Sequence, residues 1–315
     1  MLSRIAESLY WVGRYAERAE DTARILDVHI HRTLEDPSVE EDSACRTLLA
    51  VMGMGAPEEP LDNADLLQML AFDSVSTTSI AGSLVAAREN ARSARDSISS
   101  EMWECLNGTY NALPGVVARV AGGMPHAFFS YVKERAAVLH GLADSTMSRD
   151  DGWLFLVLGR SLERVDMTAR LMSASFGDGS GPAEWITTLR CCSAHEAFLR
   201  TYRRRVEPEL VAEFLLLDRL FPRSAFSALV QAEKCLAELQ PGAGRAGLDD
   251  EARRILGRAR TELEFRRVDE LIGDLPSYLS DIQSACSAAG DAVARRFFRQ
   301  TAPEEWRLEV AGGRE

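Results

Sequence analysis

Arginine and glutamate side chains recur in one pattern at two places in the chain, and they are the groups best suited to chemistry. The segments 9–26 (LYWVGRYAERAEDTARIL) and 155–172 (FLVLGRSLERVDMTARLM) share Gly-Arg-x-x-Glu-Arg-x-x-x-Thr-Ala-Arg at an offset of 146 residues. Guanidinium groups hold carboxylates or phosphates through paired hydrogen bonds. Carboxyl groups whose pKa is raised act as general acids or bases. The pattern therefore predicts a polar site suited to anion binding or proton transfer.

The repeated pattern predicts two equivalent amphipathic helices. At about 100° per residue, the polar side chains of the first segment form one stripe and the apolar side chains lie roughly opposite. A self-similar unit at nearly half the chain length indicates an internal duplication with a pseudo-twofold relation. The predicted polar-core residues are Arg14, Glu17, Arg18 and Arg24 in the first helix, and Arg160, Glu163, Arg164 and Arg170 in the second.

Gly13 and Gly159 fall in the middle of these two helices. Glycine is about 1 kcal/mol less favourable than alanine there, so we expect another backbone or a ligand to approach closely. The competing interpretation of the charged stripe is a solvated face with ion pairs along the helix, contributing about 0.2–0.5 kcal/mol each. Because the set occurs twice, we favour a shared polar core. Whether that core is structural or a functional site stays open.

A second group of charged residues lies on a predicted long helix at 79–111. Arg88, Arg92 and Arg95 share one face of it, and Glu101 is a nearby carboxylate. Three arginines on one face suit a phosphate or carboxylate ligand in a polar cavity. The alternative is a ladder of ion pairs that faces solvent. These four residues are therefore further candidates for the binding site.

Helical periodicity recurs along the whole chain, and strand signals are nearly absent. The sequence predicts an all-α fold, a multi-helix bundle that contains the two Gly-Arg/Glu-Arg helices. We expect one domain at 1–315, with repeat halves at about 1–147 and 148–310 and a frayed tail at 311–315. The predicted helices are 3–34, 41–53, 62–71, 79–111, 125–143, 150–176, 183–204, 208–217, 223–239, 249–262, 264–272 and 276–300.

Composition restricts the class of protein. With 36 Lys+Arg against 48 Asp+Glu the net charge is −12, which disfavours binding to nucleic acid or to anionic membranes. Charges interrupt the N-terminal segment too often for a signal peptide, and no apolar run approaches the roughly 20 residues of a transmembrane helix. Six cysteines without a C-x-x-C pair indicate reduced, buried thiols. We therefore expect a cytoplasmic protein.

Other motifs give little support for catalysis, a metal or a cofactor. No Glu-x-x-His is present, which disfavours a ferritin-like di-metal bundle, and we expect no metal site. Cys191 and His195 are four residues apart and are expected to be neighbours on the helix at 183–204, but such pairs are more often incidental than a Cys-His dyad. There is no P-loop and no G-x-S-x-G. We expect no cofactor, and any ATP that is used is then bound by a partner.

Four stretches of the sequence resemble the bacterial alpha-E family, which is named for its α-helices and a Glu-Arg motif. They are LSRIAESLYWVGRYAERAEDTAR (2–24), ARENARSARDSISSEMWECLN (87–107), LGRSLERVDMTARLM (158–172) and FLLLDRLFPRSAFSAL (214–229). They occur in the family's order and together span most of the chain. One departure is Arg219, where family members often have proline after the aspartate. This departure loosens the expected turn.

The resemblance implies a companion of a circularly permuted ATP-grasp protein, and often of a transglutaminase-like cysteine peptidase homologue. ATP-grasp enzymes join a carboxylate to an amine through an acyl phosphate. The association therefore implies synthesis or modification of a peptide-like amide. The resemblance carries over no catalytic residues.

Three functions fit these observations. The first is a non-catalytic or accessory partner of an ATP-grasp amide or peptide ligase, which binds an anionic substrate or carrier through the Arg/Glu-lined core. The second is a cryptic enzyme in which Glu17, Glu163 and Glu101 perform acid–base chemistry in a helical cavity. The third is an interaction protein whose Glu-Arg pairs fix the helix register. A cavity with convergent carboxylates favours the second function, and a dry, fully paired network argues against it.

Overall fold

The computed structural model describes residues 1–120, 125–176, 181–241 and 247–298, and every regular element in these ranges is helical. The predicted all-α fold is therefore confirmed for the described part of the chain. None of the helices in these ranges is long and apolar enough to cross a membrane. The predicted frayed tail at 311–315 and the end of the predicted last helix lie outside the described residues.

The first part of the chain is dominated by one long helix, α1. It ends at Glu35 because Asp36, which precedes Pro37, is forced into an extended conformation. The elements of this part are α1 (Ser3–Glu35), α2 (Glu41–Val51), α3 (Asn63–Leu67) with a π-helical turn (Gln68–Phe72), α4 (Ile80–Ser93), a 3-10 turn (Arg95–Ser97), α5 (Ser100–Val120) and α6 (Pro125–Thr146).

The second part begins with another long helix, α7. Its N-cap is Asp150, whose carboxylate accepts a hydrogen bond from the backbone N–H of Gly152 at 2.9 Å. The helices of this part are α7 (Asp151–Ser175), α8 (Pro182–Cys191), α9 (His195–Tyr202), α10 (Pro208–Leu217), α11 (Ala225–Leu239), α12 (Glu251–Phe265), α13 (Val268–Gly273) and α14 (Leu275–Phe297).

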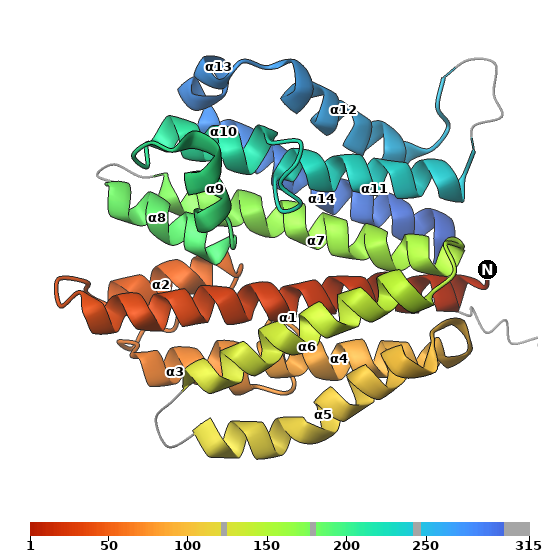
Figure 1. Cartoon of the computed structure of the whole chain (residues 1–315), viewed down its shortest axis with the longest axis horizontal. Helices are drawn as coiled ribbons and strands as arrows, with labels where there is room; N and C mark the ends of the chain where they lie inside the picture. The colour runs from red at the N-terminus through yellow and green to blue at the C-terminus, as the bar shows by residue number, and fades with distance from the viewer. Residues whose placement is uncertain (121–124, 177–180, 242–246, 299–315) are drawn as a thin grey trace, which may run out of the picture.

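The helices α1 and α7 lie side by side at the centre of the molecule (Figure 1). The first helix group consists of α1, α4, α5 and α6: α1 packs on α4 and α6, and α5 packs on both of them. The second helix group consists of α7, α11, α12 and α14: α7 packs on α11 and α14, and α12 packs on both of them. The two central helices therefore carry matching sets of neighbours.

The loops that lead into α4 and α11 make the same hydrogen bonds. The Asp73 carboxylate accepts hydrogen bonds from the next backbone N–H groups, as does the Asp218 carboxylate in its own loop. Ser79 and Ser224 then cap the two helices with their side-chain oxygens. The turn that contains Arg219 thus has the same capping hydrogen bonds as its counterpart before α4.

Two predicted helices are wrong in extent. The helix predicted at 79–111 breaks after Ser93, because α5 starts afresh after Ser99, whose hydroxyl accepts from the backbone N–H of Met102. The predicted end before Pro114 is also wrong: α5 continues through this proline. The helix predicted at 183–204 splits into α8 and α9 at a turn in which Ser193 has a φ of 54°.

Candidate functional site: two buried Glu-Arg clusters

The two central helices touch at the two glycines of the repeated pattern. A Cβ on Gly13 would lie 2.0 Å from the carbonyl oxygen of Leu156, and a Cβ on Gly159 would lie 2.0 Å from that of Tyr10. Real Cβ atoms do not approach a backbone oxygen so closely. The predicted close approach at both glycines is therefore confirmed, and the neighbour is a backbone in each case.

Beside this crossing, Glu163 of α7 receives two arginines from α1. Its carboxylate accepts from Nε of Arg14 at 2.5 Å and from Nε and Nη2 of Arg18 at 2.5 and 3.1 Å. Arg14 also donates to the Tyr10 hydroxyl at 3.2 Å. Burial raises the pKa of Glu163, but Arg14 and Arg18 outweigh burial and hold it below its usual value. We call Tyr10, Arg14, Arg18 and Glu163 the Glu163 cluster.

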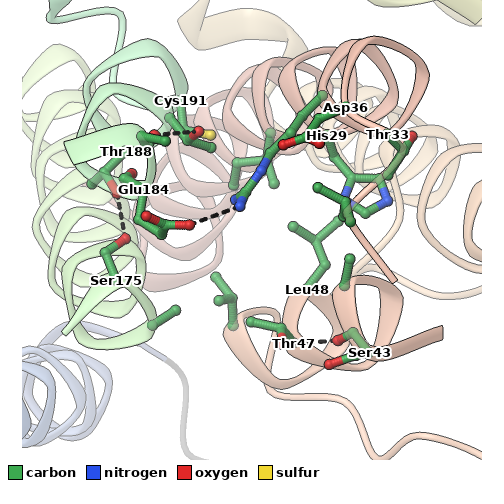
Figure 2. Close-up of a pocket in the computed structure, with 18 of the residues that line it drawn as sticks. His29, Thr33, Asp36, Ser43, Thr47, Leu48, Ser175, Glu184, Thr188 and Cys191 are labelled. Atoms are coloured by element: carbon green, nitrogen blue, oxygen red, sulfur yellow. Dashed lines mark hydrogen bonds and ion pairs between the residues drawn. The ribbon is translucent and has the colours of Figure 1, made fainter. Parts of the chain in front are cut away.

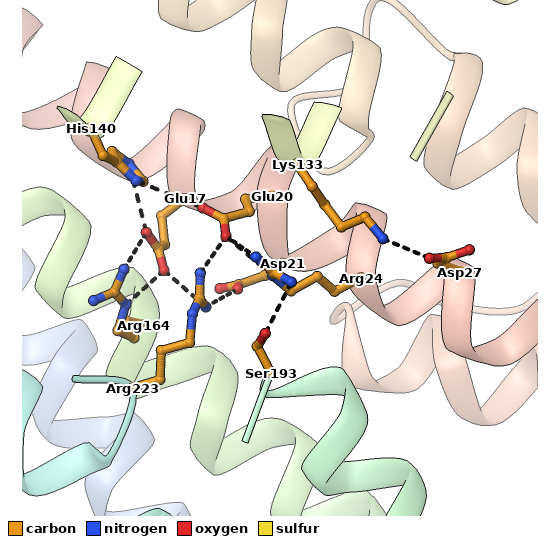
Figure 3. Close-up of polar contacts among 10 residues, drawn as sticks. All are labelled: Glu17, Glu20, Asp21, Arg24, Asp27, Lys133, His140, Arg164, Ser193 and Arg223. Carbon is orange, nitrogen blue, oxygen red and sulfur yellow. Dashed lines mark hydrogen bonds and ion pairs between the residues drawn. The ribbon is translucent and has the colours of Figure 1, made fainter. Parts of the chain in front are cut away.

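On the other side of the crossing, Glu17 of α1 receives Arg164 of α7. Arg164 donates from Nε and Nη2 to the two carboxylate oxygens at 2.7 and 2.9 Å. A second cation, Arg223, comes from the loop before α11 and lies 3.1 Å from Glu17, 2.7 Å from Glu20 and 2.6 Å from Asp21 (Figure 3). Glu17 is fully buried. We call these five residues, together with His140, the Glu17 cluster.

The Glu17 cluster contains two groups with unusual protonation. Burial raises the pKa of Asp21 to about 7, with Glu17 and Glu20 adding to the rise against the opposing effect of Arg223. Burial lowers the pKa of His140 to about 4, so its imidazole is neutral at pH 7 although it points at two carboxylates. Its Nε2 is buried without a hydrogen-bond partner and lies 3.8 Å from Glu17. The cluster therefore holds a neutral base and a carboxyl group that binds a proton near neutral pH.

The remaining predicted core residues lie at the edges of the two clusters. Arg24 donates to Glu20 one turn before it, at 2.6 Å, and Arg170 donates to Asp166 in the same way at 2.9 Å. Arg160 is largely buried beside Arg164, and burial followed by that like charge lowers its pKa. Within the described residues no carboxylate lies within ion-pair distance of Arg160.

The four candidates on α4, the following 3-10 turn and α5 do not join the core. Arg88 donates to the Asn107 side chain at 3.2 Å, and its guanidinium lies over Trp103 and Tyr110. Arg92 is exposed and pairs with a glutamate one turn earlier, and Arg95 lies exposed over Trp103. Glu101 is exposed in the first turn of α5. Because the helix breaks after Ser93, these side chains do not line one continuous face.

Five cluster members are missing from the predicted core residues. Three lie on α1 itself (Tyr10, Glu20 and Asp21), and the other two, Arg223 and His140, come from elsewhere in the chain. Arg223 lies 202 residues from Asp21 in a loop after a proline, and nothing in its local sequence points to a buried partner. His140 lies on α6, on no recognisable motif. The only signal was the charge match between Glu20 and Asp166 in the repeat, which marks a second acidic position on each helix.

A cavity of about 330 Å³ opens next to the Glu17 cluster; we call it the Arg24 cavity. Arg24, Lys133 and Arg190 line it together with two histidines, and Asp27, Glu35 and Glu196 supply the opposite charge. Two hydrogen bonds hold Arg24 at the wall of this cavity. Its guanidinium donates to the Glu20 carboxylate of the Glu17 cluster and to the Ser193 hydroxyl at 3.1 Å (Figure 3).

A larger cavity of about 480 Å³ lies between α1, α2, α7 and α8 (Figure 2). Many serine and threonine hydroxyls line it, and the Arg32 guanidinium there is paired with Glu184 at 2.9 Å. Cys191 also lines it, but burial raises the pKa of this thiol to about 12. Because α8 ends at Cys191 and α9 begins at His195, the expectation that both lie on one helix is wrong.

All six cysteines are buried and free. This agrees with the reading of the six residues as reduced thiols rather than a disulfide framework.

The chain matches a known family over most of its length. The model of Alpha-E, described as a predicted alpha-helical domain with a conserved ER motif, matches residues 1–298. The chain belongs to the Alpha-E family. Both Glu-Arg dipeptides of this Alpha-E chain, at 17–18 and 163–164, place their side chains in the buried clusters.

Mycobacterial proteins are similar to this Alpha-E chain over nearly all of it. The uncharacterised proteins Mb2597 of Mycobacterium bovis and Rv2567 of Mycobacterium tuberculosis are each 26% identical over 325 aligned positions. The match covers 92% of this chain and 36% of each relative, so the chain spans little more than a third of their length. No solved structure matches the chain.

Proposed function

We propose that this chain is an accessory, non-catalytic partner of an ATP-grasp amide or peptide ligase, in which the Glu-Arg clusters lock the two helix groups together. The observation that carries the proposal is that the buried arginines and the buried acidic side chains of the core neutralise one another. Arg164, Arg223 and Arg24 face Glu17, Glu20 and Asp21, so three cations meet three acidic groups. A buried network whose members satisfy one another fixes register and has little capacity left for a substrate.

The anionic substrate or carrier is assigned to the Arg24 cavity rather than to the interior of the core. Arg24 is the predicted core residue that reaches this cavity, and Lys133 and Arg190 add two further cations to its wall. Arg190 is exposed. Guanidinium groups at a cavity wall bind carboxylates or phosphates with paired hydrogen bonds.

The length of the relatives supports an accessory role. The matched region makes up 36% of the mycobacterial chains, so in them the Alpha-E region is one part of a longer polypeptide. A helical module that works beside a second activity fits that arrangement, and the family's resemblance-based association suggests an ATP-grasp ligase, with a transglutaminase-like peptidase homologue as a further partner.

We also infer that the two helix groups arose by duplication of one unit. The matching neighbours of α1 and α7, the matching capped loops and the reciprocal glycine contacts support this origin. An experimental structure in which the first and second groups fail to superpose would remove that support.

The test of the partner role is affinity purification of the full chain at native expression, with mass spectrometry of retained proteins and small molecules. We expect an ATP-grasp protein at near-stoichiometric yield. For the cavity, Arg190→Ala should lower retention of the anionic ligand, whereas Arg200→Ala, an exposed arginine of α9 outside the cavity, should leave it unchanged. Recovery of the chain without any ligase would contradict the proposal.

One observation favours the acid–base alternative. Asp21 has a pKa near neutral pH and lies in the same cluster as the neutral imidazole of His140, which are the properties of a general acid and a general base. The pairing of Asp21 with Arg223 favours a structural role, and substitution of Asp21 separates the two functions.

A further inference from the structure

We propose that Asp27, His31 and His126 form a binding site for a divalent transition-metal ion, with Zn²⁺ as the ion that suits the donors best. One ring nitrogen of each histidine and a carboxylate oxygen of Asp27 all lie within 4.8 Å of one another. Ligand atoms around a tetrahedral zinc ion are about 3.3 Å apart, given bonds of about 2.0–2.1 Å. Small side-chain rotations therefore bring the three donors onto one ion.

The local structure explains why these residues meet. Asp27 and His31 are one helical turn apart on α1 and so lie on the same face. His126 comes from the first turn of α6, which packs on α1. The two imidazole rings stand edge to face with their centroids 5.4 Å apart, and Nδ1 of His126 lies 2.7 Å from Oδ1 of Asp27.

Neighbouring groups orient each of the three ligands. Lys133 donates to Oδ2 of Asp27 at 2.7 Å (Figure 3), whereas Oδ1 faces the two histidines, 2.7 Å from Nδ1 of His126 and 3.5 Å from Nδ1 of His31. Nδ1 of His31 also lies 2.7 Å from the backbone carbonyl oxygen of Asp27. The Ser130 hydroxyl lies 3.4 Å from Nε2 of His126. Such outer hydrogen bonds fix the tautomer and the ring orientation of metal-bound histidines.

A second group of possible ligands, Glu17, Glu20 and His140, also has its donor atoms within 4.8 Å of one another but is far less suited to a cation. Its carboxylates already accept hydrogen bonds from Arg164 and Arg223, which would repel a divalent ion. At Asp27 the competing cation is Lys133, on the other carboxylate oxygen.

The site at Asp27 is also open to solvent. The side chains of His31 and His126 are 53% and 61% exposed, so an ion can enter from solvent and water can complete its coordination.

The position of the site gives the ion a role next to the proposed anion site, although metal binding itself does not depend on that proposal. Asp27 and His31 line the Arg24 cavity, so the ion lies at its wall. An open coordination position there accepts a carboxylate or phosphate oxygen. The ion would then add positive charge to a cavity in which Arg24, Lys133 and Arg190 are balanced by three acidic side chains.

The test is titration of the full, chelator-treated chain with Zn²⁺ by isothermal calorimetry, followed by the visible absorption of bound Co²⁺. We expect one Zn²⁺ per chain and tetrahedral Co²⁺ bands. His126→Ala should weaken binding by about 10-fold or more, while circular dichroism shows an unchanged fold.

The matched control is His195→Ala, because His195 lines the same cavity but does not belong to the three ligands. It should bind Zn²⁺ as the natural chain does, and His31→Gln provides a second ligand variant if His126→Ala does not fold. Absence of stoichiometric Zn²⁺ binding, or equal affinity in the natural chain and a folded ligand variant, would overturn the proposal.

Discussion

The Glu163 cluster and the Glu17 cluster occupy matching places on α7 and α1 but are completed differently. In each cluster a buried glutamate pairs with the arginine of the Glu-Arg dipeptide on the opposite helix. Glu163 pairs with Arg18, and Glu17 pairs with Arg164. The second cation on Glu163 is Arg14 of α1 itself. The second cation on Glu17 is Arg223, which comes from the loop before α11.

The difference shows that α1 and α7 alone supply one Glu-Arg pair on each side of the crossing. The other charged groups around each pair differ between the two sides. Glu163 stands with two cations. Glu17 shares Arg223 with Glu20 and Asp21 and lies near His140. Burial, with the neighbouring charges of Glu17 and Glu20, raises the pKa of Asp21 against the opposing effect of Arg223, so that Asp21 binds a proton near pH 7.

The largest losses of stability are expected from substitutions of the two glycines at the crossing of α1 and α7, and the two losses should be equal. Gly13→Ala and Gly159→Ala each push a methyl group to within 2.0 Å of a backbone oxygen, and a backbone cannot rotate away. We expect each to cost about 4–5 kcal/mol or to prevent folding, measured by urea unfolding. Gly108→Ala, in α5 with open space at its Cβ, should instead be neutral or stabilise by up to about 1 kcal/mol. Unequal losses at the two glycines would break the comparison.

Substitution of the two buried glutamates should lower the free energy of unfolding by unequal amounts. Glu163→Gln leaves Arg14 and Arg18 without their carboxylate, and we expect a loss of about 3–4 kcal/mol in the free energy of unfolding. Glu17→Gln should cost less, about 1–2 kcal/mol, because Arg223 keeps two acidic partners and a like charge is removed from Asp21. Chemical denaturation at pH 7 measures both, and a larger loss for Glu17→Gln would contradict the proposed charge balance.

The proton on Asp21 should appear as a pH dependence of stability. Its folded-state pKa of about 7 lies above the value of about 3.9 expected in the unfolded chain. The folded state therefore holds the proton more tightly, and the resulting stabilisation is complete below about pH 4 and lost as the pH rises through about 7. Between pH 5 and pH 7 we expect a fall of about 2 kcal/mol in the free energy of unfolding.

Asp21→Asn should remove this fall, and Glu104→Gln, on an exposed carboxyl of α5, should keep it. Denaturation curves at a series of pH values give the free energy of unfolding of each variant and of the natural chain. A variant Asp21→Asn that retains the full slope would place the proton elsewhere.

The smallest effects are expected at the outer arginines. Arg24→Gln and Arg170→Gln each break a partly exposed ion pair one turn apart on a single helix, so each should cost about 0.5 kcal/mol. Thermal unfolding of both variants measures the two losses and shows whether they are equal. A loss of several kcal/mol for Arg24→Gln alone would show that the pairing of Arg24 with Glu20 contributes far more to the lock than a partly exposed ion pair does.

Much of the fold and half of the candidate site were predictable from the sequence, for a physical reason. Helical periodicity and the repeated pattern are local signals, and they located the two glycines, Glu17, Glu163 and their arginines. Arg223 and His140 were not predictable, because they reach the core only through tertiary packing of a loop and of α6. The break after Ser93 was missed because the residues around it have good helix propensity and the competing cap at Ser99 is one hydroxyl.

The most direct test of the proposed accessory role is the amide-forming rate of the ATP-grasp ligase that we propose as the partner, in complex with the natural chain and with Asp21→Asn. If the Glu17 cluster is a lock, the substituted chain, freed of a buried acid, should support the same rate within about twofold. If Asp21 is a general acid or base, the rate should fall by about 100-fold or more while the fold and the complex persist. That fall would contradict the account and make this helical core an active site.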